Sequence, residues 1–318
     1  MRKLTDEELV DRLLSGERRA LARLLTRVED GSEDRLRGVV RLLHPHTGSA
    51  RLVGVTGSPG VGKSTLTNAL VEVWRSRDLR VAVLAVDPTS PFSGGALLGD
   101  RVRMQDHALD DGVFIRSMAS RGHLGGLSWA TPQALLVLDA AGFDIVVVET
   151  VGVGQAEVEI ASVADTTVVT MAPGMGDAIQ AAKAGILEVA DVFCVNKADR
   201  EGADRTAREL QEMQKLGDGA GEAGWTPPIE RTVASSGEGV PALADAIDRH
   251  LEWLAESGRR DARVLDRARL QVRELALGAV RKRFASMERG EIVEALARRV
   301  ADRELDPYRA ADELLAGL

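Results

Sequence analysis

The chain of 318 residues is 44% hydrophobic and 28% charged, with a net charge of −8. This composition is typical of a globular protein and excludes a disordered chain, and the acidic balance without basic clusters argues against a nucleic-acid partner. No run of about 18 apolar residues occurs and the first residues lack the apolar core of a signal peptide, so we expect no membrane span and a cytoplasmic location.

Residues 5–46 are predicted to form helices that precede the main domain. Thr5 followed by Glu8 is a capping-box pattern, Gly16 ends the first helix, and Pro45 ends the last. The apolar stripes at helical spacing are Leu9, Val10, Leu13 and Leu14, then Leu21, Leu24, Leu25 and Val28, then Leu36, Val39, Val40, Leu42 and Leu43. These faces need a partner, either the main domain or a second subunit.

From residue 51 to about 254, strand and helix patterns alternate, which predicts a mostly parallel, doubly wound α/β sheet. The expected strands are residues 52–56, 81–86, 113–116, 145–149, 167–171, 192–195 and 229–233. The expected helices are residues 63–75, 132–141, 177–189, 200–216 and 240–255. The only cysteine, Cys194, falls inside a strand and is expected to be a buried thiol without a disulfide partner.

The loop after the first expected strand has the pattern Gly-x-x-x-x-Gly-Lys-Ser. It consists of Gly57, Ser58, Pro59, Gly60, Val61, Gly62, Lys63 and Ser64, followed by Thr65. A strand before it and a helix after it predict a P-loop, in which backbone N–H groups bind a phosphate at the helix N-terminus. We expect Lys63 to reach the terminal phosphates and the Ser64 hydroxyl to bind Mg²⁺. A glycine-rich turn with an exposed lysine is the weaker alternative.

Ligands of such sheets lie at the carboxyl ends of the strands, so the later loops are candidates for the rest of the site. Asp87 and Asp100 flank a loop rich in Gly, Pro and Ser, which suits either a segment around a metal-phosphate group or a flexible surface loop with a helix cap at Asp100. Glu149 lies at the end of the fourth expected strand, and Gly152 follows three residues later. A segment that senses the γ-phosphate requires such a carboxylate, which can reach Mg²⁺ or its water, and such a glycine. Gln155 is a candidate for orienting the attacking water, or a helix cap.

The loop after the sixth expected strand is predicted to bind a guanine base. Asp199 can accept hydrogen bonds from N1–H and the exocyclic amine of guanine, whereas adenine would leave its carboxylate unpaired at a cost of about 1–3 kcal/mol. Asn196 is expected to tie this loop to its neighbours, and the Lys197 stem to pack on the base. Ser235 and Ser236 follow the last strand, where they could contact the guanine carbonyl or cap a helix.

These motifs together resemble the bacterial MeaB/ArgK family of P-loop GTPases, which includes the human MMAA-type chaperone of methylmalonyl-CoA mutase. The resemblance covers essentially the whole chain and is most specific in residues 149–155, because Ras-like GTPases carry Asp in place of Glu149. It implies a domain of residues 47–257 that binds GTP, GDP and Mg²⁺, with Asp87, Asp100 and Glu149 around the metal. It also implies a partner-sensing switch, which comprises Met175, Asp177, Gln180 and Lys183.

The resemblance implies a GTP-hydrolysing chaperone of an adenosylcobalamin-dependent acyl-CoA mutase, which gates cofactor delivery and protects the mutase. Residues 258–318 carry apolar positions at helical spacing, and the family uses this region to dimerise, so we expect a homodimer. These positions are Val264, Ala268, Val272, Leu275, Ala279 and Val280, then Ile292, Val293, Leu296 and Val300.

Two other functions stay open. A nickel metallochaperone of a related GTPase group is disfavoured, because the chain has one cysteine and five histidines to serve as ligands. A kinase linked to amino-acid transport is disfavoured because the guanine loop is present and no site for an acceptor substrate is visible.

Overall fold

The computed structural model describes residues 4–30, 33–87, 107, 109–119, 130–150, 159–174, 188–216, 224–288 and 291–316. Seven candidate site residues lie outside these ranges: Asp100, Gly152, Gln155, Met175, Asp177, Gln180 and Lys183. The chain divides into two compact units, Met1–Arg260 and Asp261–Leu318. The three-part division expected from the sequence stays a prediction.

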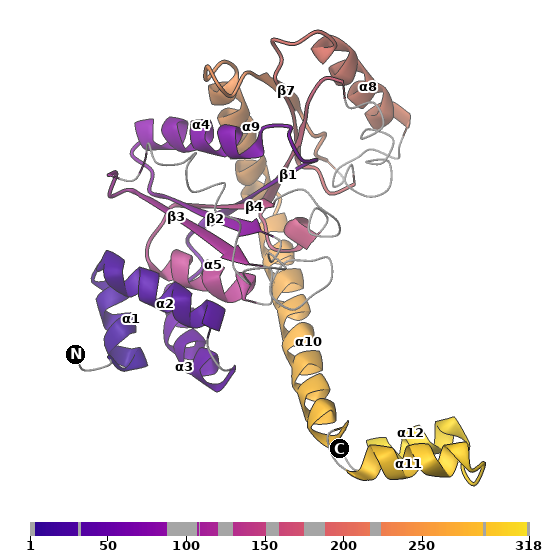
Figure 1. The fold of residues 1–318 in the computed structure, drawn as a ribbon. Helices are drawn as coiled ribbons and strands as arrows, with labels where there is room; N and C mark the ends of the chain where they lie inside the picture. Colours follow the sequence, from indigo (N-terminus) through magenta and orange to yellow (C-terminus); the bar gives the residue numbers. More distant parts are fainter. Residues whose placement is uncertain are drawn as a thin grey trace. The chain divides into compact units, whose positions relative to one another are not determined.

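The first unit is built on one seven-stranded parallel sheet, which confirms the predicted α/β fold (Figure 1). The strand order is β3-β2-β4-β1-β5-β6-β7. The strands are β1 (Arg51–Thr56), β2 (Val81–Asp87), β3 (Val113–Ala119), β4 (Ile145–Thr150), β5 (Thr166–Met171), β6 (Val192–Asn196) and β7 (Ile229–Thr232). All seven expected strands therefore exist, each with ends within a few residues of the expected ones.

Helices cover both faces of the sheet (Figure 1). On one face, α4 (Lys63–Ser76) and α9 (Val240–Glu256) share a buried cluster with side chains of the sheet such as Val53 and Val55. On the other, α5 (Thr131–Ala140) packs against residues such as Val146 and Val148. Toward the β7 edge, α8 (Ala203–Leu216) contributes to a smaller cluster with β5 and β6.

The N-terminal helices join the core of the first unit. They are α1 (Asp6–Leu14), α2 (Arg18–Asp30) and α3 (Glu33–Leu43), followed by the short η1 (His44–His46). Their apolar stripes share one buried cluster with α5 and the sheet, so the main domain is the partner that these faces require. Thr5 caps α1 as predicted, since its hydroxyl accepts from the Glu8 N–H at 3.2 Å.

Three aspartates recur at the same position of the sheet, directly before β4, β5 and β6. Each carboxylate accepts a backbone N–H at the start of a neighbouring strand, and each aspartate N–H donates to the carbonyl of that same residue. The pairs are Asp144 with Arg80, Asp165 with Leu52, and Asp191 with Thr167, at N–H to carboxylate distances of 2.7, 2.8 and 2.7 Å. These pairs hold the strands in register at one edge, so that their carboxyl ends align at the other.

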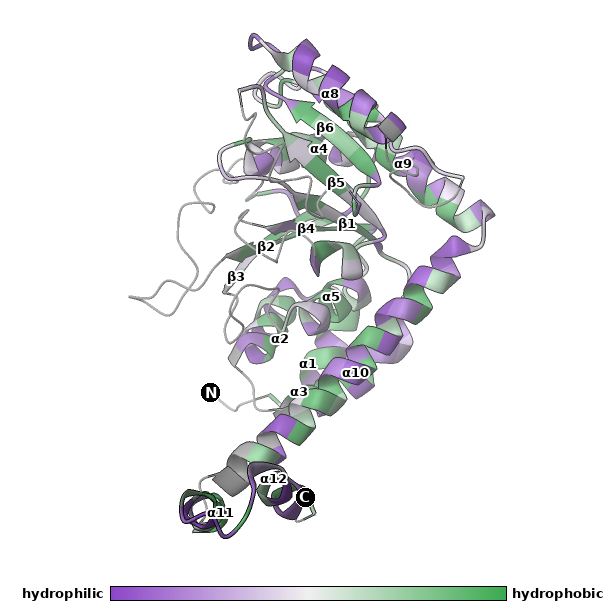
Figure 2. Ribbon diagram, turned by 90° about the vertical axis from the view of Figure 1, so that its right-hand side faces the viewer, coloured by the Kyte–Doolittle hydropathy of each residue, from purple (hydrophilic) through white to green (hydrophobic). Residues whose placement is uncertain are grey.

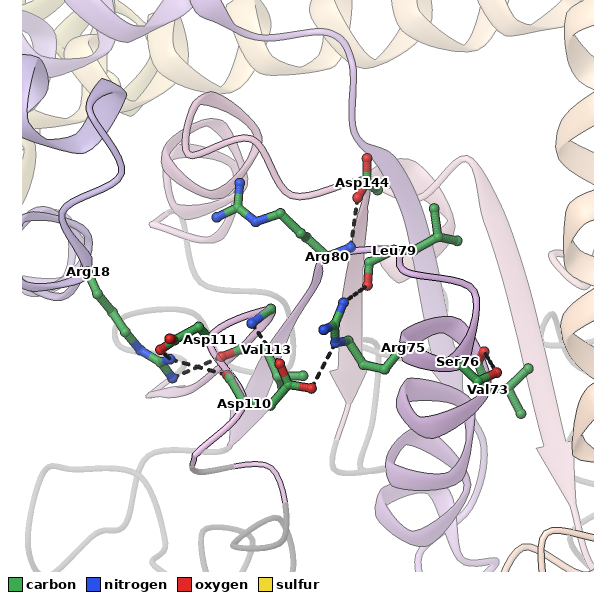
Figure 3. Close-up of polar contacts among 11 residues, drawn as sticks. Arg18, Val73, Arg75, Ser76, Leu79, Arg80, Asp110, Asp111, Val113 and Asp144 are labelled. Carbon is green, nitrogen blue, oxygen red and sulfur yellow. Dashed lines mark hydrogen bonds and ion pairs between the residues drawn. The ribbon is translucent and has the colours of Figure 1, made fainter.

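An ion pair ties the C-terminal end of α4 to the segment before β3 (Figure 3). Arg75 Nε donates to Asp110 Oδ2 at 2.8 Å, and Gly112 N donates to Asp110 Oδ1 at 2.8 Å. The hydrogen bond from Arg75 and that from Gly112 lower the pKa of Asp110. A Cβ at position 112 would lie 2.3 Å from the Arg75 guanidinium carbon, so a larger residue there would displace the guanidinium from its place beside Asp110.

The second unit is helical. It contains the body of α10 (Arg259–Glu288), then α11 (Glu291–Ala301) and α12 (Pro307–Leu315), whose first turn Asp306 caps. Hydrophobic and hydrophilic residues alternate along α10 (Figure 2). Its exposed large apolar side chains are Val264, Leu265, Leu270, Val272, Leu275, Leu277 and Val280. Within the described ranges, no helix combines the length and the apolar composition that a membrane span requires.

Candidate functional site

The candidate residues converge because parallel strands end at a common edge. The P-loop leaves β1, and Glu149 lies on the adjacent strand β4, in register with Val55 of β1. Asp87 ends β2, the other neighbour of β4, and Asn196 ends β6. Residues far apart in the chain are thereby brought to one edge of the sheet.

The P-loop depends on glycine at two of its positions. Gly57 has φ 138°, and a Cβ there would lie 2.1 Å from the Thr170 carbonyl oxygen. Gly62 has φ 97°, and its Cβ would lie 2.5 Å from Asn196 Nδ2. Gly62 is also the residue before α4, so the loop ends at a helix N-terminus, which favours an anion.

Lys63 lies across the loop that precedes it. Its side chain is buried, and Nζ donates to Gly57 O at 2.7 Å and to Ser58 O at 3.1 Å. These bonds hold the ammonium group at the loop, where phosphate oxygens would be stronger, charge-assisted acceptors.

Ser64 and Glu149 form the link between the P-loop helix and β4. The Ser64 hydroxyl donates to Glu149 Oε1 at 2.6 Å, although 85 positions separate the two residues. A hydroxyl and a carboxylate are the hard oxygen ligands that Mg²⁺ prefers, so this pair fits the predicted metal site. At the last residues of β1 and β4, the buried hydroxyls of Thr56 and Thr150 lie 3.1 Å apart and join the two strand ends.

The expected base loop packs against the P-loop. Asn196 Nδ2 donates to Val61 O at 2.9 Å, and Lys197 Nζ donates to Gly60 O at 2.6 Å. Lys197 adopts a left-handed backbone with φ 57°, which turns the chain toward the exposed Asp199. The carboxylate of Asp199 is therefore accessible at the same edge of the sheet as the phosphate loop.

Ser235 and Ser236 lie in an exposed turn after β7. A pairing of Val233 with Glu238 closes this turn, and both the N–H and the hydroxyl of Ser236 donate to Val233 O, at 3.0 and 3.2 Å. Their contact with a guanine carbonyl stays a prediction.

The sequence motifs did not predict two residues that contact Asn196, namely Thr232 and Ala234. The Thr232 hydroxyl and the Ala234 N–H each donate to Asn196 Oδ1 at 3.1 Å. The sequence holds no local signal for these contacts, because they depend on the pairing of β6 with β7, in which Asn196 is in register with Thr232. Cys194 is buried as expected, and burial raises its pKa to about 12.

A parallel sheet with a P-loop after β1, a serine and a carboxylate joined beside it, and an Asn-Lys-x-Asp loop after β6 defines a P-loop nucleotide-binding protein of the GTPase class.

Comparisons with known proteins agree with the assignment to the GTPase class. A family model described as methylmalonyl Co-A mutase-associated GTPase MeaB matches residues 21–289. A Pyrococcus abyssi protein with a provisional GTPase name is 50% identical over 97% of this chain and 95% of its own length. GTPase ArgK of Escherichia coli is 39% identical over 79% of this chain and 78% of its own. The mouse methylmalonic aciduria type A homolog, a mitochondrial protein, is 35% identical over 83% and 64%.

A solved structure named LAO/AO transport system kinase matches with a TM-score of 0.74 and 28% identity, and covers 99% of this chain and 98% of that one. The chain belongs to the MeaB family and is a GTPase.

Proposed function

We propose that this GTPase is a chaperone that gates adenosylcobalamin delivery to an acyl-CoA mutase of the methylmalonyl-CoA type and protects that mutase. The match of residues 21–289 to a mutase-associated family carries the proposal. The mouse relative, named for methylmalonic aciduria, supports it.

The site supplies the chemistry of a slow switch. Asp199 selects guanine, and Lys63 neutralises charge on the terminal phosphates. Ser64 and Glu149, with Asp87 and Asp100, would hold Mg²⁺, which neutralises charge that develops in phosphoryl transfer. The hydrogen bond between Ser64 and Glu149 supports this assignment, because it already places two oxygen ligands together.

The coupling to a partner would use Met175, Asp177, Gln180 and Lys183, a role that rests on the family resemblance alone. The second unit would form a homodimer. Exposed apolar side chains along α10, such as Val264 and Val272, support this part of the proposal, because exposed apolar surface favours association.

A pull-down tests the chaperone role. We expect the wild-type protein to retain a mutase subunit in a way that depends on whether GDP or a non-hydrolysable GTP analogue is bound. Lys63→Ala should lose this nucleotide dependence, whereas Lys215→Ala, an exposed lysine of α8, should keep it. Purified methylmalonyl- and isobutyryl-CoA mutases that neither bind nor change the GTPase rate would refute the proposal.

Labelled GTP distinguishes the alternative of a transport-linked kinase, a name that the related solved structure carries. If the γ-phosphate of GTP is labelled, we expect all of the released label to appear as inorganic phosphate. Transfer to another acceptor would favour the kinase.

A further inference from the structure

Thr232 contacts the base loop through both its main chain and its side chain. It ends β7 and is fully buried. Its carbonyl accepts from Ala198 N at 3.0 Å, and its hydroxyl donates to Asn196 Oδ1 at 3.1 Å. The same hydroxyl oxygen lies 3.2 Å from Cys194 Sγ, on the strand that leads into the base loop.

The direction of each hydrogen bond follows from groups that have only one role. Val61 O can only accept and Ala234 N–H can only donate, so the Asn196 amide has one orientation, with Nδ2 toward Val61 and Oδ1 toward Ala234. Thr232 must therefore be the donor to Oδ1. Its oxygen then accepts from Cys194, whose thiol keeps its proton because burial raises its pKa to about 12.

The end of this chain of bonds lies against the P-loop. Asn196 Nδ2 occupies the space that a Cβ on Gly62 would need, 2.5 Å away, and Gly62 is the residue before α4. The distance between the loop that binds phosphate and the loop that binds the base thus depends on where Asn196 lies. A nucleotide that spans both loops binds more tightly when that distance is set beforehand.

We propose that Thr232, supported by Cys194, is a positioning residue for guanine-nucleotide binding. It orients Asn196 so that the base loop and the P-loop stand at the separation that the nucleotide requires. Neither side chain needs to touch the nucleotide.

The test compares Thr232→Val, which removes the hydroxyl at similar volume, with Thr232→Ser, which retains it. We expect Thr232→Val to raise the Kd for GDP, measured by calorimetry with Mg²⁺, by about tenfold, the value of one buried hydrogen bond. Thr232→Ser should stay within about twofold of the wild type. In steady-state hydrolysis, Thr232→Val should raise KM and leave kcat unchanged, because Lys63, Ser64 and Glu149 are untouched.

A second pair keeps the test decisive if Thr232→Val fails to fold, which thermal unfolding without nucleotide would reveal. Cys194→Ser retains a donor to Thr232 and Cys194→Ala does not, so Cys194→Ala should bind GDP about two- to threefold more weakly than Cys194→Ser. Three results would overturn the proposal: wild-type affinity in Thr232→Val, equal weakening in Thr232→Ser, or equal affinity in the two Cys194 variants.

Discussion

At the scale of single residues, the site combines a buried cation with an accessible anion. Lys63 is buried, and two carbonyls of its own loop accept from its ammonium group, which offsets part of the cost of burying the charge. Asp199 is exposed at the same edge of the sheet. The first group suits phosphate and the second suits the hydrogen-bond donors of a base.

The first prediction concerns base selection by Asp199. In Asp199→Asn, the amide offers an N–H₂ donor in place of one carboxylate oxygen. Guanine presents two donors to this side chain, and in the variant one of them faces the amide N–H₂, which is also a donor. Guanine nucleotides should therefore bind at least about 100-fold more weakly. Xanthine has a carbonyl in place of the amine, so hydrolysis of xanthosine triphosphate should rise relative to that of GTP.

Steady-state kinetics with both triphosphates measure this change in preference. Asp302→Asn, at an exposed position of the second unit, is the control and should keep the preference for GTP. If Asp199→Asn also keeps that preference, Asp199 does not read the base.

At the scale of elements, the sheet is held in register at the edge opposite the site. Asp144, Asp165 and Asp191 each exchange two hydrogen bonds with a neighbouring strand. A slip of one residue would turn every side chain of a strand to the opposite face. These aspartates therefore support the alignment of the strand ends from which the site loops leave.

The second prediction tests one of these pairs. Asp165→Ala leaves the buried N–H of Leu52 without its carboxylate acceptor and should lower the free energy of unfolding by about 1–3 kcal/mol. Asp165→Asn should cost less, because an amide oxygen can still accept. Urea unfolding measures both.

Asp111→Ala serves as the control, since that side chain is fully exposed, and its effect should stay within about 0.5 kcal/mol. An equal, small effect of Asp165→Ala would show that the pair does not stabilise the sheet.

The third prediction concerns acid and the ion pair between α4 and the segment before β3. The hydrogen bond from Arg75 lowers the pKa of Asp110 below its ordinary value of 3.8, so the ionised carboxylate stabilises the folded state. This contribution is complete above about pH 5 and is lost as the pH falls through 3.8 toward the lowered pKa.

The difference in stability between the wild type and Asp110→Asn should therefore shrink on acidification. Urea midpoints at about pH 7, 5, 4 and 3 measure it. A difference that stays constant over this range would contradict the assignment.

At the scale of the whole molecule, the described chain consists of two units of different character. Met1–Arg260 buries its apolar residues around the sheet, whereas the α10 helix in Asp261–Leu318 exposes several of them. An exposed apolar surface of this kind favours a partner.

The fourth prediction tests a homodimer formed through α10. Val272 is 68% exposed, and Val272→Asp should place a charge in the proposed interface and yield a monomer. Light scattering should give twice 34.0 kDa for the wild type and 34.0 kDa for the variant. Arg281→Ala, an exposed position on the same helix, should remain dimeric. A monomeric wild type at micromolar concentration would refute the dimer.

Local sequence patterns predicted most of the described helices and strands, and they indicated which loops form the candidate site. Apolar β-branched runs predicted all seven strands, and the capping pair Thr5 and Glu8 predicted the start of α1. Strand, glycine-rich loop and helix together predicted the P-loop, and Asn196 to Asp199 predicted guanine. These signals are readable because periodicity, caps and tight turns depend on neighbours within a few positions.

Only the tertiary structure decided which of these elements meet. The order of the strands places Glu149 beside Ser64 and Thr232 beside Asn196, across 85 and 36 positions of the chain. The tertiary structure also shows that the apolar faces of the N-terminal helices are buried in one cluster with α5, so they do not need a second subunit to cover them. An apolar stripe states that a face must be buried but not against what, because burial is non-directional and strand order depends on the packing of the whole sheet.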